Sequence, residues 1–162
     1  MPLFLWEPLQ TMAATFTAIQ TGEDPWVALG NFSNEWFLYA CDRRKELVAD
    51  APASITATSL DASDERRWLA FIAASTEYLC AQYAVTCPLW ASHSRYRLVT
   101  PWYDVVYLDQ EIQTWLGETT PEPFRRRNIY CGNTVFLDKR MVVNTLADQP
   151  DALEGTVFGL ST

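Results

Sequence analysis

Three consecutive arginines, Arg125, Arg126 and Arg127, have the clearest capacity for chemistry in this sequence. They make up a quarter of the 12 basic residues in a chain of 162 residues that also has 20 acidic ones. An arginine guanidinium can hold a carboxylate or a phosphate through two parallel hydrogen bonds. The cluster can therefore serve a buried ion pair, a protein partner or a nucleic acid.

The helical geometry expected around the cluster separates the roles of its members. A helix turns by about 100° per residue, so the three arginines cannot all face the same way. Because Phe124 and Ile129 should be buried, at least one arginine should point inward with them. Glu77 lies among alanines on a helix that another helix can approach closely, so its carboxylate is either at the rim of the packed face or buried with a cation. We predict that Arg126 forms a structural ion pair with Glu77.

The residues predicted to bind a partner form two groups. One is the outward-facing remainder of the arginine cluster. The other is acidic, because residues 1–42 contain five acidic residues and no Lys or Arg. This segment either keeps the chain soluble or presents an acidic face to a basic partner. The predicted partner-binding residues are Arg125, Arg127, Asn128, Glu23, Asp24 and Glu35.

The residue combinations typical of enzymes are absent from the sequence. His93 is the only histidine, and its neighbours Ser92 and Ser94 adjoin it in the chain, where side chains seldom face each other productively. We therefore predict a binding protein without catalytic residues. An enzyme site assembled from Glu77, Tyr78, His93 and an arginine remains the alternative.

The four cysteines do not have the spacing of a structural metal site. Cys80, Cys87 and His93 lack the short C-x2–4-C hairpin that organises zinc, and six glycines leave little room for a phosphate-binding loop. A chain of this length can form an adequate core without disulfides. We predict no metal, no cofactor and reduced thiols.

The beginning of the chain does not have the pattern of a signal peptide. It is apolar but has no basic region, and Glu7 and Pro8 interrupt it. No run approaches the roughly 18 apolar residues that a membrane helix needs. We predict a cytoplasmic protein that does not associate with membranes.

Apolar residues at helical spacing predict the elements that position these side chains. A loop is predicted at 50–60, and an ordered surface segment rich in aromatic residues at 86–103. Thr120 is predicted to cap a short helix that carries the arginines and ends near Gly132. The other helices are predicted at 9–19, at 25–40 after an Asp24 cap, at 43–49, at 64–84 and at 105–116, stopping at Gly117.

Together these elements predict an all-α, bundle-like fold with one domain over residues 1–147. Residues 134–143 can form a short strand or a helix, and the acidic segment 148–162 should be frayed. The helix at 64–84 should pack its apolar stripe against the second helix. The residues of this contact are predicted to be Trp68, Ile72, Leu79 and Tyr83 against Trp36 and Phe37.

The segment TPEPFRRRNIYCGNTVFLD, with the upstream RRWLAFIAASTEYLC and the intervening PLW, YRL and PWY, resembles a family of small bacterial helical proteins. Similar pieces accompany helix-turn-helix antitoxin regulators, often beside nucleotidyltransferase-like toxins. The resemblance covers residues 26–138, and its most specific part is Pro123 to Gly132. No helix-turn-helix precedes it here, because residues 1–25 supply only one helix and no basic recognition surface. The resemblance therefore implies protein binding rather than DNA binding.

Two functions follow as expectations from the sequence. The first is a non-enzymatic protein-binding module, similar to an antitoxin, that neutralises a basic protein such as a nucleotidyltransferase-like toxin. The second is binding of RNA or single-stranded nucleic acid by Arg125–Arg127 and the aromatic residues of 86–103. Formation of a homo-oligomer stays open.

Overall fold

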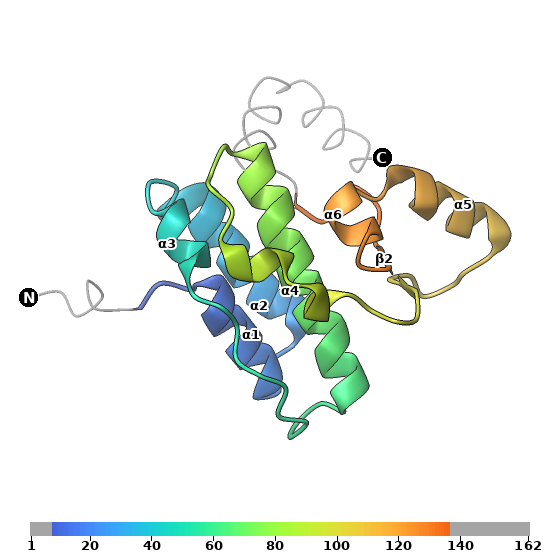
Figure 1. Ribbon diagram of the computed structural model, residues 1–162, viewed down its shortest axis with the longest axis horizontal. Helices are drawn as coiled ribbons and strands as arrows, with labels where there is room; N and C mark the ends of the chain where they lie inside the picture. The colour runs from blue at the N-terminus through green and yellow to red at the C-terminus, as the bar shows by residue number, and fades with distance from the viewer. Residues whose placement is uncertain (1–7, 137–162) are drawn as a thin grey trace, which may run out of the picture.

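The helix α4 (Ala62–Gln82) forms the centre of the molecule, and the other elements pack around it (Figure 1). The structure, a computed structural model, describes residues 8–136. The predictions for residues 137–147 and for the acidic segment 148–162 lie outside the described residues. The mainly helical class predicted from the sequence is confirmed.

Local capping residues set the ends of α4. The side chain of Asp61 accepts a hydrogen bond from the backbone N–H of Asp64 at 2.9 Å, which satisfies a donor at the start of the helix. Beyond the last turn, Ala84 has a positive φ of 54°, so the helix cannot continue. The predicted helix over 64–84 is confirmed.

The middle of α4 is buried on all sides. Every side chain from Leu69 to Cys80 is buried except that of Tyr78, which is half-buried. A helix that is covered all round lies inside the protein rather than at its surface. The sequence predicted one apolar stripe, and the extra burial arises because chain segments pack on α4 from two directions.

Three shorter helices cover one side of α4. They are α1 (Met12–Gln20), α2 (Pro25–Asn34) and α3 (Arg44–Ala49), and a π-helical turn over Glu35–Tyr39 extends α2. Gly22 has a φ of 104° after α1, and Asp24 caps α2 by accepting from Trp26 N–H at 2.8 Å. The predicted helices in this half of the chain are confirmed.

The second helix contacts α4 at both ends, but only one end uses the predicted residues. Tyr83 packs edge-on against Trp36 and Phe37, with ring centroids 6.0 and 5.7 Å apart. Trp68 instead packs against Trp26 at the start of α2 and against Trp102, with ring centroids 5.5 and 5.1 Å away. The prediction for Trp68 is wrong because this side chain is only partly buried and lies at the opposite end of α2 from Trp36 and Phe37.

The segment after α4 folds back across the helix (Figure 1). It forms two short 3₁₀ turns, Leu89–Ser92 and Ser94–Tyr96, and then the strand β1 (Trp102–Tyr103). The indole N–H of Trp90 donates to the Val48 carbonyl at 2.9 Å, which fastens this segment to the end of α3. The segment is ordered as predicted, but it does not lie wholly at the surface, because Ala91 and Tyr96 are buried.

The segment that carries the arginines is less helical than predicted. Helix α6 covers only Glu122–Arg125, and β2 (Ile129–Tyr130) pairs with β1 in parallel, with Trp102 opposite Ile129. The predicted helix to Gly132 is wrong because these residues form backbone hydrogen bonds with another segment. Thr120 does not cap α6 through its side chain; its hydroxyl accepts from Gly132 N–H at 2.8 Å.

Helix α5 (Gln110–Thr119) lies at the edge of the molecule, beside α6 and away from α1 to α3 (Figure 1). It begins after Asp109, whose side chain accepts from Ile112 N–H at 2.8 Å, and it continues past Gly117. The prediction of a helix over 105–116 is therefore shifted by several residues. The first four of those residues are exposed and not helical.

The small β1–β2 sheet is the only sheet in residues 8–136. It does not include the segment 134–143 where a strand was predicted, and most of that segment lies outside the described residues. No helix within 8–136 has the length and apolar character to cross a membrane.

Candidate binding site around the arginine cluster

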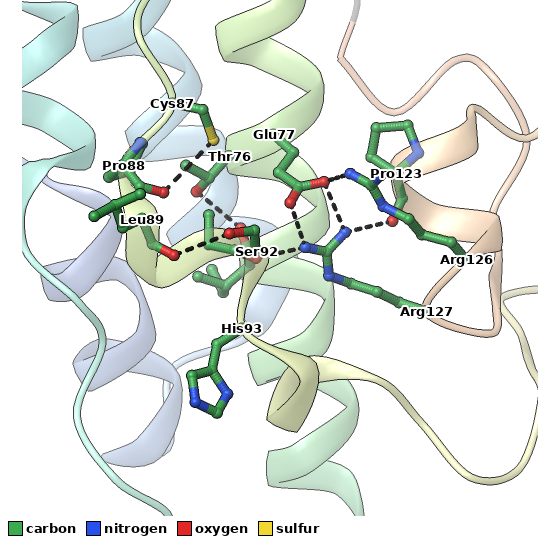
Figure 2. A network of polar contacts seen from close by, with 12 residues as sticks. Thr76, Glu77, Cys87, Pro88, Leu89, Ser92, His93, Pro123, Arg126 and Arg127 are labelled. Carbon is green, nitrogen blue, oxygen red and sulfur yellow. Dashed lines mark hydrogen bonds and ion pairs between the residues drawn. The ribbon is translucent and has the colours of Figure 1, made fainter.

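Arg127, in the turn after α6, forms a buried ion pair with Glu77 of α4. Arg127 Nη1 donates to Glu77 Oε2 at 3.1 Å, and Arg127 Nη2 lies 2.8 Å from Glu77 Oε1. Only 5% of Arg127 and 8% of Glu77 is exposed. Figure 2 shows this two-pronged contact, in which the guanidinium faces both carboxylate oxygens.

Arg127 also holds two turns of the backbone in place. Its Nη1 donates to the Pro123 carbonyl at 2.7 Å, and its Nη2 donates to the Ala91 carbonyl. Burial lowers the pKa of the Arg127 guanidinium, but arginine keeps its charge in proteins. One side chain therefore joins α4, α6 and the 3₁₀ turn that contains Ala91.

Arg126 contacts the same carboxylate from the solvent side. Its Nη2 pairs with Glu77 Oε2, and half of its side chain is exposed. The predicted Arg126–Glu77 ion pair is present, and Figure 2 shows both guanidinium groups converging on Glu77. Arg125 points elsewhere and pairs with Glu122 at 3.2 Å on the surface.

The prediction that Arg127 is exposed is wrong. The backbone from Phe124 to Arg127 still follows one helical turn, because Arg127 N–H donates to the Phe124 carbonyl at 3.0 Å. Residues three apart on a turn share a face, so burial of Phe124 carries Arg127 inward with it. This spacing was visible in the sequence and identifies Arg127 as the buried member.

Asn128, also predicted to bind a partner, holds the chain reversal after α6. Its φ is 63°, a left-handed conformation that asparagine tolerates better than most residues. Its side-chain amide donates to the Leu98 carbonyl, and its own carbonyl accepts from Trp102 N–H at 2.8 Å. Asn128 therefore has a structural role that the sequence did not reveal.

The acidic residues predicted to bind a partner are dispersed. Glu23 and Asp24 are exposed before the start of α2, and Asp24 also caps that helix. Glu35 is half-buried at the other end of α2. A helix of this length spans about 15 Å, so the three carboxylates do not form one compact patch.

A hollow of about 270 Å³ opens beside the ion pair, and it joins Glu77 with His93 and Arg97. This is part of the combination considered for an enzyme. The Glu77 carboxylate is neutralised by two arginines, which makes it a poor base. His93 Nδ1 accepts from Arg95 N–H at 3.1 Å, and Figure 2 shows its ring turned away from Glu77. The chemistry that these groups support is anion binding.

A second hollow, of about 330 Å³, adjoins the first and was not predicted. Its cationic side chains come from two segments, α4 and the turn after it, and Arg97 lines both hollows. In the sequence, the signals were the pair RR in the first turns of α4 and the alternation RYR around buried Tyr96. The arginines of this second hollow are Arg66, Arg67, Arg95 and Arg97.

All four cysteines carry free thiols, and the side chains of Cys80 and Cys87 lie close enough to interact. Burial raises the pKa of Cys80 and of Cys131 to about 12, so both thiols stay protonated at neutral pH. Within residues 8–136, no group of three or more His, Cys, Asp or Glu side chains is placed to hold a metal ion.

The residues that carry the resemblance to antitoxin-like helical proteins have structural roles in this chain. Phe124 and Ile129 are buried, Arg127 holds Glu77, and Asn128 fixes the following turn. These roles explain the Pro123 to Gly132 motif by folding alone. A comparison with protein-family models, curated proteins and solved structures found no match for the chain.

Proposed function

We propose that the protein is a non-enzymatic protein-binding module that docks on a basic partner through a projecting arm, residues 105–119. The observation that carries the proposal is the exposure of apolar side chains on this arm. Val106 is fully exposed, and Tyr107 and Trp115 are 71% and 52% exposed. Several exposed apolar side chains on one segment are typical of protein interaction sites.

The arm contributes few buried side chains to the protein. Leu116 is the only buried side chain of α5, and it lies with part of the Trp115 ring against Gly132, where an added Cβ would be 3.7 Å from Leu116 Cδ2 and from Trp115 Cη2. Val105 and Leu108 are 37% and 42% exposed, so the rest of the protein covers both of them only in part. The arm therefore presents apolar side chains that need another surface to cover them.

Charge defines the chemistry of that surface. Residues 105–119 contain three acidic residues, Asp109, Glu111 and Glu118, and no Lys or Arg. An apolar centre surrounded by carboxylates complements an apolar pocket with lysines and arginines at its rim. A basic partner is also what the acidic N-terminal segment favours, since residues 1–42 contain no Lys or Arg.

The resemblance to antitoxin-like proteins suggests the kind of partner. A nucleotidyltransferase-like toxin must bind a phosphorylated substrate, and a cleft for that purpose is basic. An acidic, apolar arm that enters such a cleft would neutralise the toxin by excluding its substrate. The absence of a catalytic arrangement at Glu77 and His93 supports a binding role over an enzymatic one.

The test compares two double variants that are matched in chemistry. Val106→Ser with Tyr107→Ser alters the arm, whereas Leu89→Ser with Tyr39→Ser alters equally exposed apolar residues elsewhere. Each variant is used as bait in the native host, and the recovered protein is then purified and titrated against all baits by calorimetry. Because all four side chains are exposed, both variants should melt like the parent.

The expected result is one basic protein, bound in a 1:1 complex by the parent and by the control variant. The arm variant should bind it at least tenfold more weakly, and binding should weaken as salt is raised. Equal loss in both variants, unchanged binding by the arm variant, or an acidic partner would each contradict the proposal.

A further inference from the structure

Three neighbouring hollows form one continuous track along α4 and the turns that cross it. The central hollow, of about 330 Å³, shares Arg66 and Arg95 with a hollow of about 280 Å³ on one side. It shares Arg97 with the hollow of about 270 Å³ beside the Glu77 ion pair on the other. The shared side chains make the three hollows a single extended surface, here called the arginine track.

The track concentrates positive charge on an acidic protein. Six arginines and a single carboxylate, Glu77, line the three hollows, and the six are half of the 12 basic residues of the chain. Glu77 is already paired with two of these arginines. The arginines of the track are Arg66, Arg67, Arg95, Arg97, Arg126 and Arg127.

Several of these guanidinium groups are available to a ligand. Arg66 and Arg97 are exposed, and neither forms an ion pair within residues 8–136. Half of the Arg126 side chain reaches solvent despite its contact with Glu77. Arg67 pairs with Asp64 at 3.3 Å, but this is a surface contact that competes weakly with a bound anion.

We propose that the arginine track binds a single-stranded nucleic acid. Successive guanidinium groups along an extended surface suit successive phosphates of one strand, since each group can hold a phosphate through two hydrogen bonds. The hydroxyl groups of Ser63 and Thr100 line the central hollow and can donate to the same oxygens. The backbone of the strand lies along this line of donors.

The end hollow beyond Arg66 and Arg95 has a different character and receives a base. Its other walls are mostly apolar and include Pro52, Ile55 and Leu69. A base is flat and apolar on its faces and can stack on a guanidinium plane. An acidic peptide supplies carboxylates for the arginines but nothing flat for this recess, so the combination favours a nucleic acid.

The track lies in a different place from the nucleic-acid site expected from the sequence. That expectation assigned the contact to Arg125–Arg127, of which Arg127 is buried and Arg125 pairs with Glu122. Only Arg126 connects the two locations, because it is exposed and also lines the track. The net charge of −8 restricts binding to this one surface and disfavours a duplex, which needs a broad basic face.

Fluorescence anisotropy of a labelled oligouridylate of about 12 nucleotides tests the proposal directly. The parent is compared with Arg66→Gln/Arg97→Gln on the track and with Arg43→Gln/Lys45→Gln, which removes two exposed charges away from it. Melting temperatures confirm that every variant is folded. An oligothymidylate, a duplex of the same length, uridine monophosphate and an oligoglutamate serve as competitors.

The expected result is binding whose affinity falls roughly 50-fold between about 50 and 200 mM salt, as four phosphate contacts to a single strand predict. The track variant should bind at least tenfold more weakly with about half the salt slope, while the control variant stays within about twofold. Absence of binding at about 50 mM salt overturns the proposal. The proposal is also overturned if the control variant loses as much affinity as the track variant. It is overturned as well if the monophosphate, the duplex or the oligoglutamate competes as effectively as the single strands.

Discussion

Replacing Arg127 by alanine tests whether the buried ion pair determines the stability of the fold. The change leaves Glu77, whose side chain is only 9% exposed, with a single contact from the half-exposed Arg126. It also removes the donors that hold the carbonyls of Pro123 and Ala91. Breaking a buried pair costs about 3 to 5 kcal/mol, and the remaining Arg126 contact places the expected cost near the lower limit, about 3 kcal/mol.

Arg125→Ala is the matched control for this change. It removes the same side chain two positions away, where the ion pair with Glu122 is exposed and contributes about 0 to 1 kcal/mol. Thermal melts and urea titrations of both variants measure the difference. For a protein of this size, the Arg127 variant should melt roughly 6 to 12 °C below the parent, and the Arg125 variant within about 4 °C of it.

A third variant separates the loss of a contact from the cost of an unpaired charge. Replacing both Arg127 and Glu77 by methionine leaves no buried carboxylate, so it should be less destabilising than Arg127→Met alone. If Arg127→Ala melts like Arg125→Ala, the buried pair has no stabilising role and the reasoning is refuted. If the double variant is no more stable than Arg127→Met, the loss of stability comes from lost packing and not from the unpaired Glu77 charge.

Four further predictions follow from the burial and contacts of individual residues. Burial alone would raise the pKa of Glu65, but hydrogen bonds from neighbouring backbone and side-chain groups outweigh it and lower the pKa. The parent should therefore have a higher free energy of unfolding than Glu65→Gln at neutral pH and lose this advantage as the pH falls below about 4. Urea titrations at several pH values measure the difference. Asn128→Ala should be less stable than Asn128→Gly by about 1 kcal/mol in the same assay, because alanine at a φ of 63° adds strain. Phe71→Ala should cost about 3 to 5 kcal/mol, since its side chain is completely buried among aromatic rings. In a thiol-reagent time course on the native protein, Cys80 and Cys131 should react far more slowly than the two exposed cysteines, and equal rates would contradict the raised pKa of both thiols.

The elements that could be predicted from the sequence are those whose ends depend on local contacts. Asp24 and Asp61 cap their helices through hydrogen bonds that reach only two or three residues along the chain. Gly22 ends α1 through its own backbone conformation. Such interactions are complete within a short segment, so the residue types alone indicate them.

The errors occur where distant segments determine the local structure. Residues 129–130 pair with 102–103, and the bond from Gly132 N–H uses the Thr120 hydroxyl that otherwise suits a helix cap. The spacing of Val105 and Leu108 resembles a helix, yet these residues precede α5 and stay exposed. Helical spacing of apolar residues identifies a surface that could be buried, but it does not show that another part of the protein packs against that surface.

The buried arginine connects the stability of the core to the proposed nucleic-acid surface. Arg127 holds the Ala91 carbonyl at the start of the turns that carry Arg95 and Arg97, and it pairs with the same Glu77 that orients Arg126. The positions of three exposed guanidinium groups therefore depend on one side chain that contacts almost no solvent. Arg127→Lys keeps the positive charge but loses the planar guanidinium fork. This variant should bind oligouridylate more weakly than the parent even at temperatures where its melting curve shows that it is fully folded. Binding equal to that of the parent in a folded Arg127→Lys variant would show that the track forms independently of the ion pair.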